Sequence, residues 1–373
     1  MIERTKQIMT CVVGLGGAGC NTINRLFSLS IPNICLIAAN TDSQSLQRIK
    51  AHKIILLGPK LTNGRGTGGD YRIGRQAAEE SFREIFHALE SMEIVFLTAG
   101  MGGGTGSGAI EIAARVAQSM NIRTISVVTL PFSFESSQRA MRAREATIAL
   151  QVFSDTLITI PNDKLIEMAT HETPLGIALA ISDDYLTKSI QAISTLIHGK
   201  GLLNIDMSHI TRALSQKGGT YISMGTSSGK NRANKAIDIA LNHPLIENIS
   251  LKESSSVILQ LAGALSIKET ETAMNYLKKH LPKNSEIIPA LDTNDLGEGK
   301  VQATILATGV GSFSIPDLSN EFDNETIPAL PEEMGIEEND SRFVFTSSEQ
   351  DPTDYEVPAF IRKGYNLQKS QAQ

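Results

Sequence analysis

Several features are scarce in this chain of 373 residues, and each scarcity narrows the class of protein. The only cysteines are Cys11, Cys20 and Cys35, an odd number without the spacing of a metal site. We therefore expect buried free thiols in a reducing compartment. No apolar run approaches the thickness of a bilayer, and residues 1–7 lack the apolar core of a signal peptide. These absences predict a cytoplasmic protein with no membrane insertion of its own.

Positive charge is also in short supply. The formal net charge is -6 and the isoelectric point is near 5.7, which argues against nucleic acid or an anionic membrane as the main partner. A hydrophobic content of 41% with 20% charged residues is typical of a globular protein. The length exceeds that of one ordinary domain, so we expect two domains and an additional segment.

Glycine, by contrast, is concentrated. Residues 100–108 read Gly-Met-Gly-Gly-Gly-Thr-Gly-Ser-Gly, between an apolar, β-prone segment at 93–98 and a helical pattern at 109–117. A strand, a glycine-rich turn and a helix N-terminus make an anion site, because backbone N–H groups converge there and no Cβ blocks a phosphate. A purely structural turn would explain two or three glycines, so the pattern favours phosphate binding.

Strands and helices alternate along the first half of the chain. This order predicts a Rossmann-like parallel sheet covered on both faces, with ligands at the carboxyl ends of its strands. A long helix at 173–197 leads to a smaller α/β unit without a phosphate-type loop. The predicted strands are 8–13, 34–39, 53–57, 93–98, 123–130 and 156–160, then 220–225, 256–262, 285–290 and 301–308; the predicted helices are 22–29, 73–89, 109–117, 138–150, 231–242 and 268–279.

Beyond residue 310 the composition changes. Residues 311–355 carry twelve acidic side chains against the single Arg342, which predicts a disordered acidic linker. The apolar and basic end of the chain is typical of a short docking peptide, although composition alone leaves a random tail as an alternative. The expected divisions are a nucleotide-binding domain at 1–172, a central helix and following loop at 173–209, a smaller α/β domain at 210–310, the linker at 311–355, and a docking peptide and tail at 356–373.

Residues 14–19 match G-x-G-x-x-G between a strand and a helix, and Asp42 ends the next strand. Alone, this pattern indicates a dinucleotide fold, so an NAD-dependent oxidoreductase remains a remote alternative. Three phosphate-suited loops, at 14–19, 64–69 and 100–108, instead favour a nucleoside di- or triphosphate held from several sides. The sequence contains no G-x-x-x-x-G-K-[ST] motif, so it is not a P-loop NTPase.

These motifs together resemble the FtsZ family of bacterial tubulin-like cell-division GTPases. The resemblance covers residues 8 to about 310 in order, plus the tail peptide. The segments that carry it are 14–21, Asn40-Thr41-Asp42, Gly-Gly-Gly-Thr-Gly-Ser-Gly at 102–108, Pro131 to Glu135 with Arg139, Ile160 to Leu165, Asn204-Ile205-Asp206, and 357–363.

The resemblance implies a tubulin-type fold that binds GTP or GDP, with Mg²⁺ able to offset charge near Asp70. Asp183 and Asp184 match the family's guanine-reading pair, usually Asn-Asp, and Asp184 fits a carboxylate that accepts from guanine N1 and N2. Leu179 stands where the family commonly has an aromatic ring. Without this resemblance, the two acids would be interpreted as part of a solvated helix face. Glu135 and Arg139 would be interpreted as an ion pair in the first turn of a helix. The implied nucleotide-binding residues are Gly17, Ala18, Gly19, Cys20, Asn21, Asn40, Asp42, Asp70, Gly104, Thr105, Gly106, Glu135, Arg139, Asp183 and Asp184.

The implied catalytic residues are Asn204, Asp206 and His209. In the family this loop enters the neighbouring subunit's nucleotide site, and its two acids polarise the attacking water. Here His209 replaces the second acid. A neutral imidazole could act as a base near pH 7 but cannot supply the missing negative charge. We therefore predict an assembly-dependent GTPase with slow hydrolysis, while Asp206 alone could equally be a helix N-cap.

The resemblance also implies partners. Head-to-tail stacking through a heterologous interface that does not close produces a homopolymeric filament. A membrane-adaptor protein would bind the tail through Val357, Pro358, Phe360, Ile361 and Arg362, with avidity along the filament, at the division site. A nucleotide-dependent scaffold or paralogue with little GTPase activity remains an open alternative.

Overall fold

The computed structural model describes residues 9–166, 174–198, 209, 212–213, 219–243, 251, 254–292 and 296–310. All of them belong to one unit, residues 1–313. The expected acidic linker and docking peptide lie outside the described residues, as do Asn204 and Asp206.

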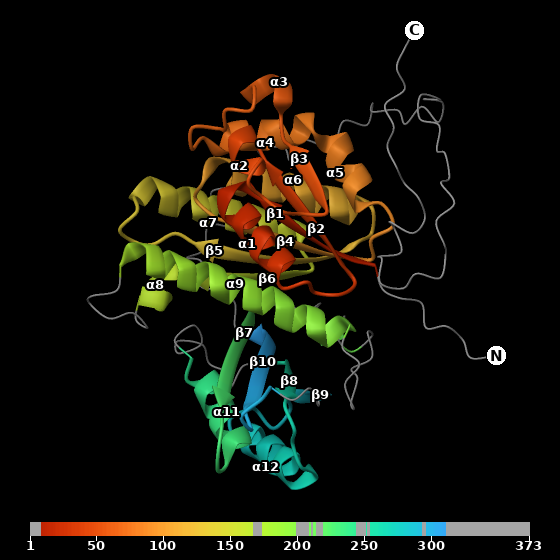
Figure 1. The fold of residues 1–373 in the computed structure, drawn as a ribbon, viewed down its shortest axis with the longest axis vertical. Helices are drawn as coiled ribbons and strands as arrows, with labels where there is room; N and C mark the ends of the chain where they lie inside the picture. The colour runs from red at the N-terminus through yellow and green to blue at the C-terminus, as the bar shows by residue number, and fades with distance from the viewer. Residues whose placement is uncertain are drawn as a thin grey trace, which may run out of the picture. The chain divides into compact units, whose positions relative to one another are not determined.

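The first part of the chain forms a six-stranded sheet, drawn from red to yellow in Figure 1. Its strand order is β3-β2-β1-β4-β5-β6, and every neighbouring pair is parallel. Nearly continuous apolar runs make strands that are buried on both faces, and most residues of these strands are buried. The predicted fold class is therefore confirmed. The strands are β1 (Thr10–Leu15), β2 (Ile34–Asn40), β3 (Lys53–Leu56), β4 (Ile94–Gly100), β5 (Arg123–Leu130) and β6 (Thr156–Pro161).

Helices cover both faces of this sheet. On one face α1 and α9 share an apolar cluster with alternate strand residues such as Val12 and Phe96. On the other, α6 packs against β4 and β5, α7 against β5 and β6, and α4 against α6. The helices of this part are α1 (Gly16–Ser28), α2 (Ser43–Leu46), α3 (Pro59–Thr62), α4 (Tyr71–Glu80), α5 (Phe82–Leu89), α6 (Gly104–Ser119), α7 (Ser137–Phe153), α8 (Asn162–Ile166) and α9 (Leu175–His198).

The prediction of one helix over 73–89 is wrong, because the segment divides into α4 and α5 at Ser81. Ser81 is 1% exposed. Its hydroxyl accepts a hydrogen bond from Gly58 N at 3.0 Å and donates to Leu56 O at 3.4 Å. These bonds tie the break to the end of β3. Periodicity along one helix cannot reveal a long-range contact of this kind.

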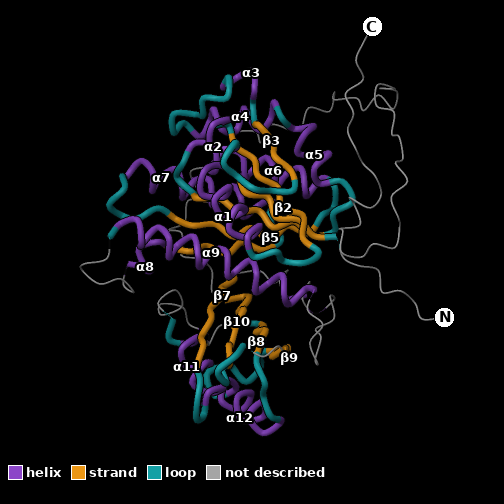
Figure 2. Tube along the Cα trace, in the orientation of Figure 1, coloured by secondary structure: helices purple, strands orange, loops and turns teal. Residues whose placement is uncertain are grey.

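The second sheet has the order β7-β10-β8-β9, visible in the tube of Figure 2. Strand β10 is antiparallel to β7 and β8, whereas β8 and β9 are parallel. The apolar cluster of α9 continues into this sheet through Ile222, Ile258 and Leu306. Tyr185 on α9 also donates a hydrogen bond to Ile222 O at 2.8 Å. The elements are β7 (Gly219–Ser227), α11 (Arg232–Leu241), β8 (Ser256–Ala262), α12 (Ile267–Lys278), β9 (Glu286–Asp292) and β10 (Val301–Val310).

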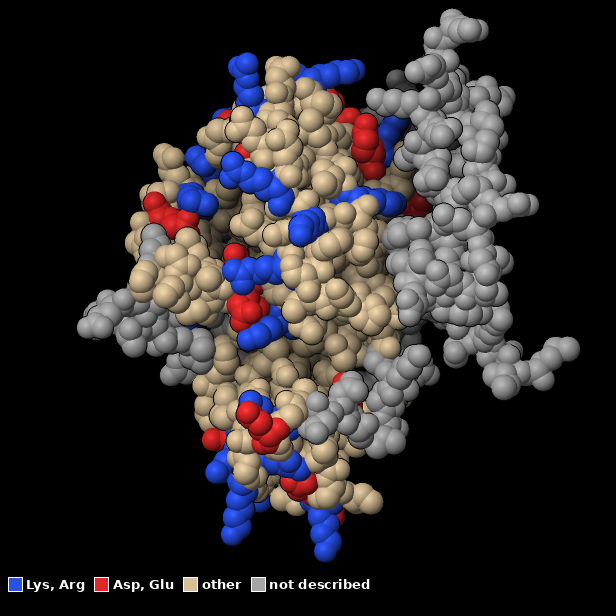
Figure 3. All heavy atoms as spheres, in the orientation of Figure 1, with Lys and Arg blue, Asp and Glu red and all other residues tan. Residues whose placement is uncertain are grey.

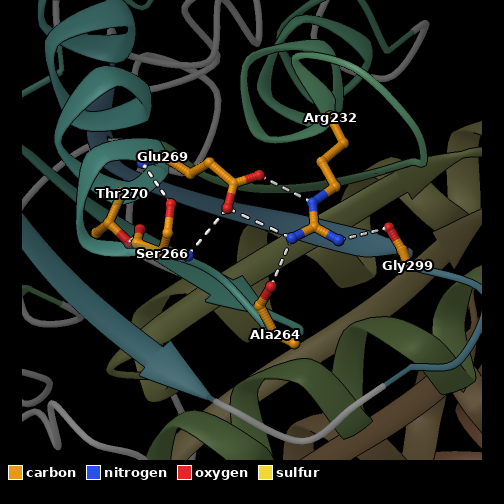
Figure 4. A network of polar contacts seen from close by, with 6 residues as sticks. All are labelled: Arg232, Ala264, Ser266, Glu269, Thr270 and Gly299. Atoms are coloured by element: carbon orange, nitrogen blue, oxygen red, sulfur yellow. Dashed lines mark hydrogen bonds and ion pairs between the residues drawn. The ribbon is translucent and has the colours of Figure 1, made fainter.

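Arg232 connects the beginnings of α11 and α12 in this second part (Figure 4). Its guanidinium donates to both carboxylate oxygens of Glu269, at 3.0 and 3.4 Å, to Ala264 O at 2.5 Å and to Gly299 O at 2.9 Å. Glu269 also closes a capping box with Ser266 at the start of α12. One cation therefore fixes two helices and the turn before β10.

Surface charge is mixed on the face drawn in Figure 3, where Lys and Arg lie among Asp and Glu over both parts of the molecule. A typical pair is Arg123 with Asp155, whose atoms lie 3.0 Å apart at the surface. Exposed pairs of this kind each contribute about 1 kcal/mol or less. Stability therefore depends mainly on the apolar clusters and on partly buried networks such as that of Arg232.

Candidate functional site

A cavity of about 490 Å³ lies at the carboxyl ends of the parallel strands. Ends of strands, the N-termini of two helices and one side of α9 form its walls, as expected for an open α/β sheet. Its lining residues are Leu15, Gly17, Ala18, Thr67, Gly100, Met101, Gly103, Gly104, Thr105, Gly106, Thr129, Pro131, Phe132, Phe134, Glu135, Arg139, Asn162, Leu179, Ser182 and Asp183.

The N-termini of α1 and α6 both open into this cavity, and both helices begin inside the glycine-rich stretches. The residues preceding them, Leu15 and Gly103, make no side-chain cap, so the first N–H groups remain available for an anion. The two turns approach closely: a Cβ added to Gly16, whose φ is +70°, would lie 2.8 Å from Gly106 N. Only glycine permits this convergence of two helix N-termini.

Two hydroxyl groups in the α6 turn have different roles. Ser107 Oγ accepts a hydrogen bond from Gly102 N at 2.8 Å, and Gly102 has a φ of +87°. Ser107 therefore holds the turn. Thr105 Oγ1 lies 2.6 Å from Thr41 Oγ1, with both residues buried. When Thr41 donates, the Thr105 hydroxyl hydrogen remains free to donate into the cavity.

Glu135 and Arg139 line the next part of the wall. Their charged groups lie 2.6 Å apart at i, i+4 spacing, and Glu135 Oε1 also accepts from Phe132 N at 2.9 Å. Phe132 stacks on Phe134 with ring centroids 5.0 Å apart, and Phe134 is 59% exposed. The ion pair considered from the sequence is thus present, and it lies at the cavity rather than on a remote surface.

The far end of the cavity lies between β6 and α9. Asn162 Oδ1 accepts a hydrogen bond from Ser182 Oγ at 2.5 Å, and Asp183 follows. Partial burial raises the pKa of Asp183, and Arg25, 3.8 Å away, opposes that shift. Asp184 does not line the cavity; its carboxylate lies 2.8 Å from Lys188 Nζ at the surface.

Several other predicted residues support the cavity without lining it. Gly19 packs against the backbone of β4, because a Cβ at this position would overlap Thr98 O. The Cys20 thiol donates to Gly14 O and Ala39 O, both at 3.6 Å, and burial raises its pKa to about 12. Asn21 is exposed on α1. Cys20 is therefore an inert core thiol, and Cys11 and Cys35 are also buried.

The remaining predicted polar residues near the loops, one amide and two acids, have structural partners. Asn40 is buried and accepts from Thr41 N at 2.9 Å. Asp42 caps α2 and accepts from Ser45 Oγ at 2.6 Å, which lowers its pKa. Asp70 caps α4 and pairs with the Arg72 guanidinium, which lowers its pKa. Asp42, at the position of the ribose acid in a dinucleotide fold, is thus engaged by its own turn.

His209 is exposed, and its predicted companions Asn204 and Asp206 lie outside the described residues. Among the residues that the structure describes, no group of three or more His, Cys, Asp or Glu side chains could hold a metal ion. A divalent cation at this site would therefore depend on ligands other than such a cluster.

Sequence reasoning did not select Thr67, Phe134, Asn162 or Ser182, although all four line the cavity. Three of them lie in stretches that carry a motif: the loop at 64–69, the 131–135 motif and the 160–165 motif. Ser182 had no signal of its own, because only the packing of α9 against α8 brings it to Asn162.

Comparisons with known proteins agree with this geometry. Residues 9–170 match the model of the Tubulin/FtsZ family, GTPase domain, and residues 218–311 match that of the FtsZ family, C-terminal domain. The chain belongs to the FtsZ family. It is 38% identical over 323 residues to Cell division protein FtsZ 1 of Pyrococcus woesei, covering 86% of each chain. It is 33% identical over 380 residues to Cell division protein FtsZ of Buchnera aphidicola subsp. Baizongia pistaciae, covering 97% of this chain and 98% of that one.

Solved structures give the same result. An empty FtsZ dimer from M. jannaschii aligns with a TM-score of 0.77 at 36% identity, covering 82% of this chain and 89% of that chain. CetZ2 from Haloferax volcanii, in a GTPγS-bound protofilament, aligns at 0.69 with 19% identity and shows the fold alone.

The GTPase domain of this FtsZ-family protein therefore supplies every wall of the cavity except α9. Within the described part of the chain, no helix combines the length and the apolar character needed to cross a membrane.

Proposed function

We propose that this FtsZ-family protein binds GTP in the cavity, assembles head-to-tail into filaments and hydrolyses GTP at the junctions during cell division. The observation that carries the proposal is the convergence of two uncapped helix N-termini on one cavity within a GTPase domain of this family. Backbone N–H groups and helix dipoles favour phosphate there. The family membership supports cell division as the process.

The ligand's orientation follows from the charges. The phosphates bind at Gly17, Ala18 and Gly104 to Gly106, while the sugar lies near Glu135 and Arg139. The base lies at the α9 end, where the Asp183 carboxylate can accept from guanine N1–H and N2–H. Leu179, 45% exposed, provides an aliphatic contact for the base in place of an aromatic ring. Adenine offers no matching donors, so the site selects guanine.

Mg²⁺ binds with the nucleotide. It prefers oxygen ligands, retains several waters and is commonly held by substrate phosphates. That mode needs no cluster of three protein ligands, which agrees with the described residues. The Thr105 hydroxyl lies at the same helix terminus and can donate to a phosphate oxygen or accept from a water on the ion. The ion would neutralise phosphate charge.

Hydrolysis requires a second subunit, which supplies Asn204, Asp206 and His209 to the open side of the nucleotide. A heterologous contact that does not close produces a filament with one nucleotide at each junction. His209 lacks the negative charge that the family's second acid supplies, so hydrolysis is slow. Beyond the described residues, the acidic linker and the peptide at 357–362 would recruit a membrane adaptor and place the filament at the division site, in the cytoplasm.

Two measurements test this function. Sedimentation with GTP, GDP and a slowly hydrolysed analogue should give pellets only with the triphosphates; pelleting that ignores the nucleotide would contradict the proposal. Phosphate release should be faster for His209→Asp than for the wild type. Equal or lower release by the variant removes the explanation of slow hydrolysis. If neither protein releases phosphate, the filament is a nucleotide-dependent scaffold.

A further inference from the structure

The second part of the molecule has a cavity of its own, at the beginnings of α11 and α12. It measures about 680 Å³ and shares no described lining residue with the nucleotide cavity. Glu269 is the one acid among the described residues that line it, and the Arg232 guanidinium already binds its carboxylate, as Figure 4 shows. The charge that this cavity offers to a partner is therefore set by its lysines.

Three lysines make the cavity positively charged. Lys230 precedes α11, Lys235 lies in α11, and Lys268 is the second residue of α12. All three are exposed, and no ion pair joins any of them to a residue that the structure describes. Ile267, next to Lys268, adds an apolar side chain that is 88% exposed. We call these three lysines and Ile267 the basic surface.

The contacts between α11 and α12 fix the spacing of these side chains. Arg232 on α11 binds Glu269 on α12. Tyr276 Oη on α12 donates to Asp238 Oδ1 on α11 at 3.0 Å. These bonds also occupy two carboxylates that would otherwise oppose an acidic partner. The basic surface is therefore positioned before any partner binds.

The charge of the sequence is divided unevenly between the linker and the rest of the chain. Residues 311–355 carry twelve acidic side chains and Arg342, which gives the linker a formal net charge of -11. The whole chain has a net charge of -6, so the remainder carries +5. Two copies of this protein therefore attract each other where the linker of one meets a basic surface of the other.

Residues 332–340 are the part of the linker that fits the basic surface. They read Glu-Glu-Met-Gly-Ile-Glu-Glu-Asn-Asp, with five acidic side chains in nine residues. The acids can pair with the three lysines, and Met334 or Ile336 can contact Ile267. No lysine or arginine occurs between residues 311 and 341, so no cation of the neighbouring sequence competes for these acids.

The length of β10 favours a neighbouring copy as the source of this segment. The strand begins at Val301, two residues after Gly299, whose carbonyl Arg232 binds. Its ten residues span about 33 Å, so the chain passes Val310 at roughly that distance from the basic surface. A random coil of the 21 residues from 311 to 331 has an average end-to-end distance of about 25 Å. The segment of the same copy would have to stretch beyond this average, whereas a neighbouring copy is free of that constraint.

We propose that the basic surface of one copy binds residues 332–340 of a copy in a neighbouring filament and so holds filaments side by side. This inference rests on the proposed function, because it takes filaments as the assembly in which the copies meet. A single contact is weak, since exposed ion pairs contribute little and salt screens them. Repetition along two filaments adds avidity, so bundles form at low ionic strength and dissolve as the salt concentration rises.

The experiment exchanges the charges of the two partners in the full-length protein. The surface variant carries Lys230→Glu, Lys235→Glu and Lys268→Glu. The segment variant carries Glu332→Lys, Glu333→Lys, Glu337→Lys, Glu338→Lys and Asp340→Lys, and a double variant carries both sets. The control variant makes the same change of net charge as the surface variant at exposed positions of the first part: Arg48→Glu, Lys50→Glu and Arg83→Glu.

Filaments are assembled with GTPγS and centrifuged over a series of KCl concentrations. Low speed pellets bundles, and high speed also pellets single filaments. We expect the surface variant and the segment variant each to lose half of their bundles at a KCl concentration about two-fold or more below that of the wild type, with high-speed pellets unchanged. The control variant should resemble the wild type. Filaments of the surface and segment variants, assembled separately and then mixed, should form bundles again, because each then meets its complement on the other filament.

Four results would overturn the inference. They are wild-type filaments that never pellet at low speed, a control variant as impaired as the surface variant, a mixture that does not recover, and recovery in the double variant alone, which would place the contact within one chain. Phosphatidylglycerol vesicles that bind the wild type but not the surface variant, with bundling unchanged, would assign the surface to a membrane instead.

Thermal unfolding of each variant checks the fold. If the surface variant does not fold, glutamine at the same three lysines removes the charges and carries the same expectation of weaker bundling. A wild-type protein that does not pellet at high speed with GTPγS would contradict the proposed function instead, so the two failures are distinguishable.

Discussion

Asp183 and Asp184 are neighbours on α9, but the structure gives them different surroundings, and their exchange for asparagine makes a matched pair of experiments. Asp183 lines the cavity with a side chain 24% exposed, whereas Asp184 is 50% exposed and paired with Lys188. We expect Asp183→Asn to weaken GTP binding and Asp184→Asn to leave it nearly unchanged. The resemblance to the family had favoured Asp184 for the role of base reader.

The expected magnitude follows from the chemistry of the contact. Guanine N1–H and N2–H can both donate to one carboxylate, and hydrogen bonds to a charged group contribute about 1.5–3 kcal/mol. Asparagine keeps one acceptor but turns its amide N–H toward the guanine amino group. The loss of one such bond weakens GTP binding roughly 10- to 150-fold. The exposed i, i+4 pair of Asp184 with Lys188 contributes about 0.5 kcal/mol or less to the fold.

A change of specificity gives a sharper readout than a loss of affinity. Xanthine has a carbonyl group at C2 where guanine has an amino group, so an asparagine in place of Asp183 could accept from N1–H and donate to that carbonyl. We therefore expect Asp183→Asn to gain affinity for xanthosine triphosphate while losing affinity for GTP. Competition of both nucleotides against a fluorescent guanine nucleotide measures the two effects in one assay.

The fold should tolerate the change, because the partial burial that raises the pKa of Asp183 also makes its charge unfavourable there. Its contact with Arg25 contributes little to stability, because the charged groups lie 3.8 Å apart and the arginine side chain is 40% exposed. Thermal unfolding of both variants should match the wild type. The reasoning is refuted if Asp184→Asn loses more GTP affinity than Asp183→Asn, or if Asp183→Asn shows no change in base preference.

Three further predictions concern the scaffold. Gly108→Ala should lower the free energy of unfolding by about 1–3 kcal/mol in denaturant titrations, because its Cβ would overlap the α4 backbone. Gly176→Ala on α9, where nothing lies within 4 Å, should instead raise it by up to about 1 kcal/mol; equal effects of the two changes would contradict the packing argument. Arg232→Met should destabilise the protein by about 1–3 kcal/mol. The hydrogen bonds of Arg232 lower the pKa of Glu269 to about 2. The wild-type ion pair therefore stabilises the fold fully at pH values above the ordinary pKa of glutamate, and this stabilisation is lost as the pH falls toward the lowered pKa. Acidification over that pH range should therefore lower the free energy of unfolding of Arg232→Met less than that of the wild type. The difference should be about 1 kcal/mol or less, because Glu269 is one-third exposed. Finally, iodoacetamide at pH 8 should modify Cys20 only after unfolding, since burial raises its pKa to about 12; rapid labelling of the native protein would show that α1 opens.

Much of the fold could be predicted from the sequence because its local signals agree with one another. Apolar runs such as 94–97 and 125–128 are long enough for buried strands, and each is followed by glycine or proline and then by a helical pattern. Alternation of that kind leaves a parallel sheet as the simple solution. The predicted helix starts were less accurate. Helix α1 begins at Gly16 and not at Thr22, because a glycine-rich stretch that is predicted to be a turn can also form the first turn of a helix.

What the sequence determined by itself was the chemistry: glycine-rich turns before helices attract phosphate wherever the chain places them, and the family motifs identify the GTPase. What only the tertiary structure decided was which side chains meet the ligand. Asp183 and Asp184 have the same chemistry, and the way α9 is rotated in its packing against α1, β5 and α8 places Asp183 at the cavity and Asp184 beside Lys188. Asp42 and Asp70 had seemed suited to a nucleotide, yet local caps occupy both carboxylates. Contacts such as those of Asp183 at the cavity depend on segments distant in sequence.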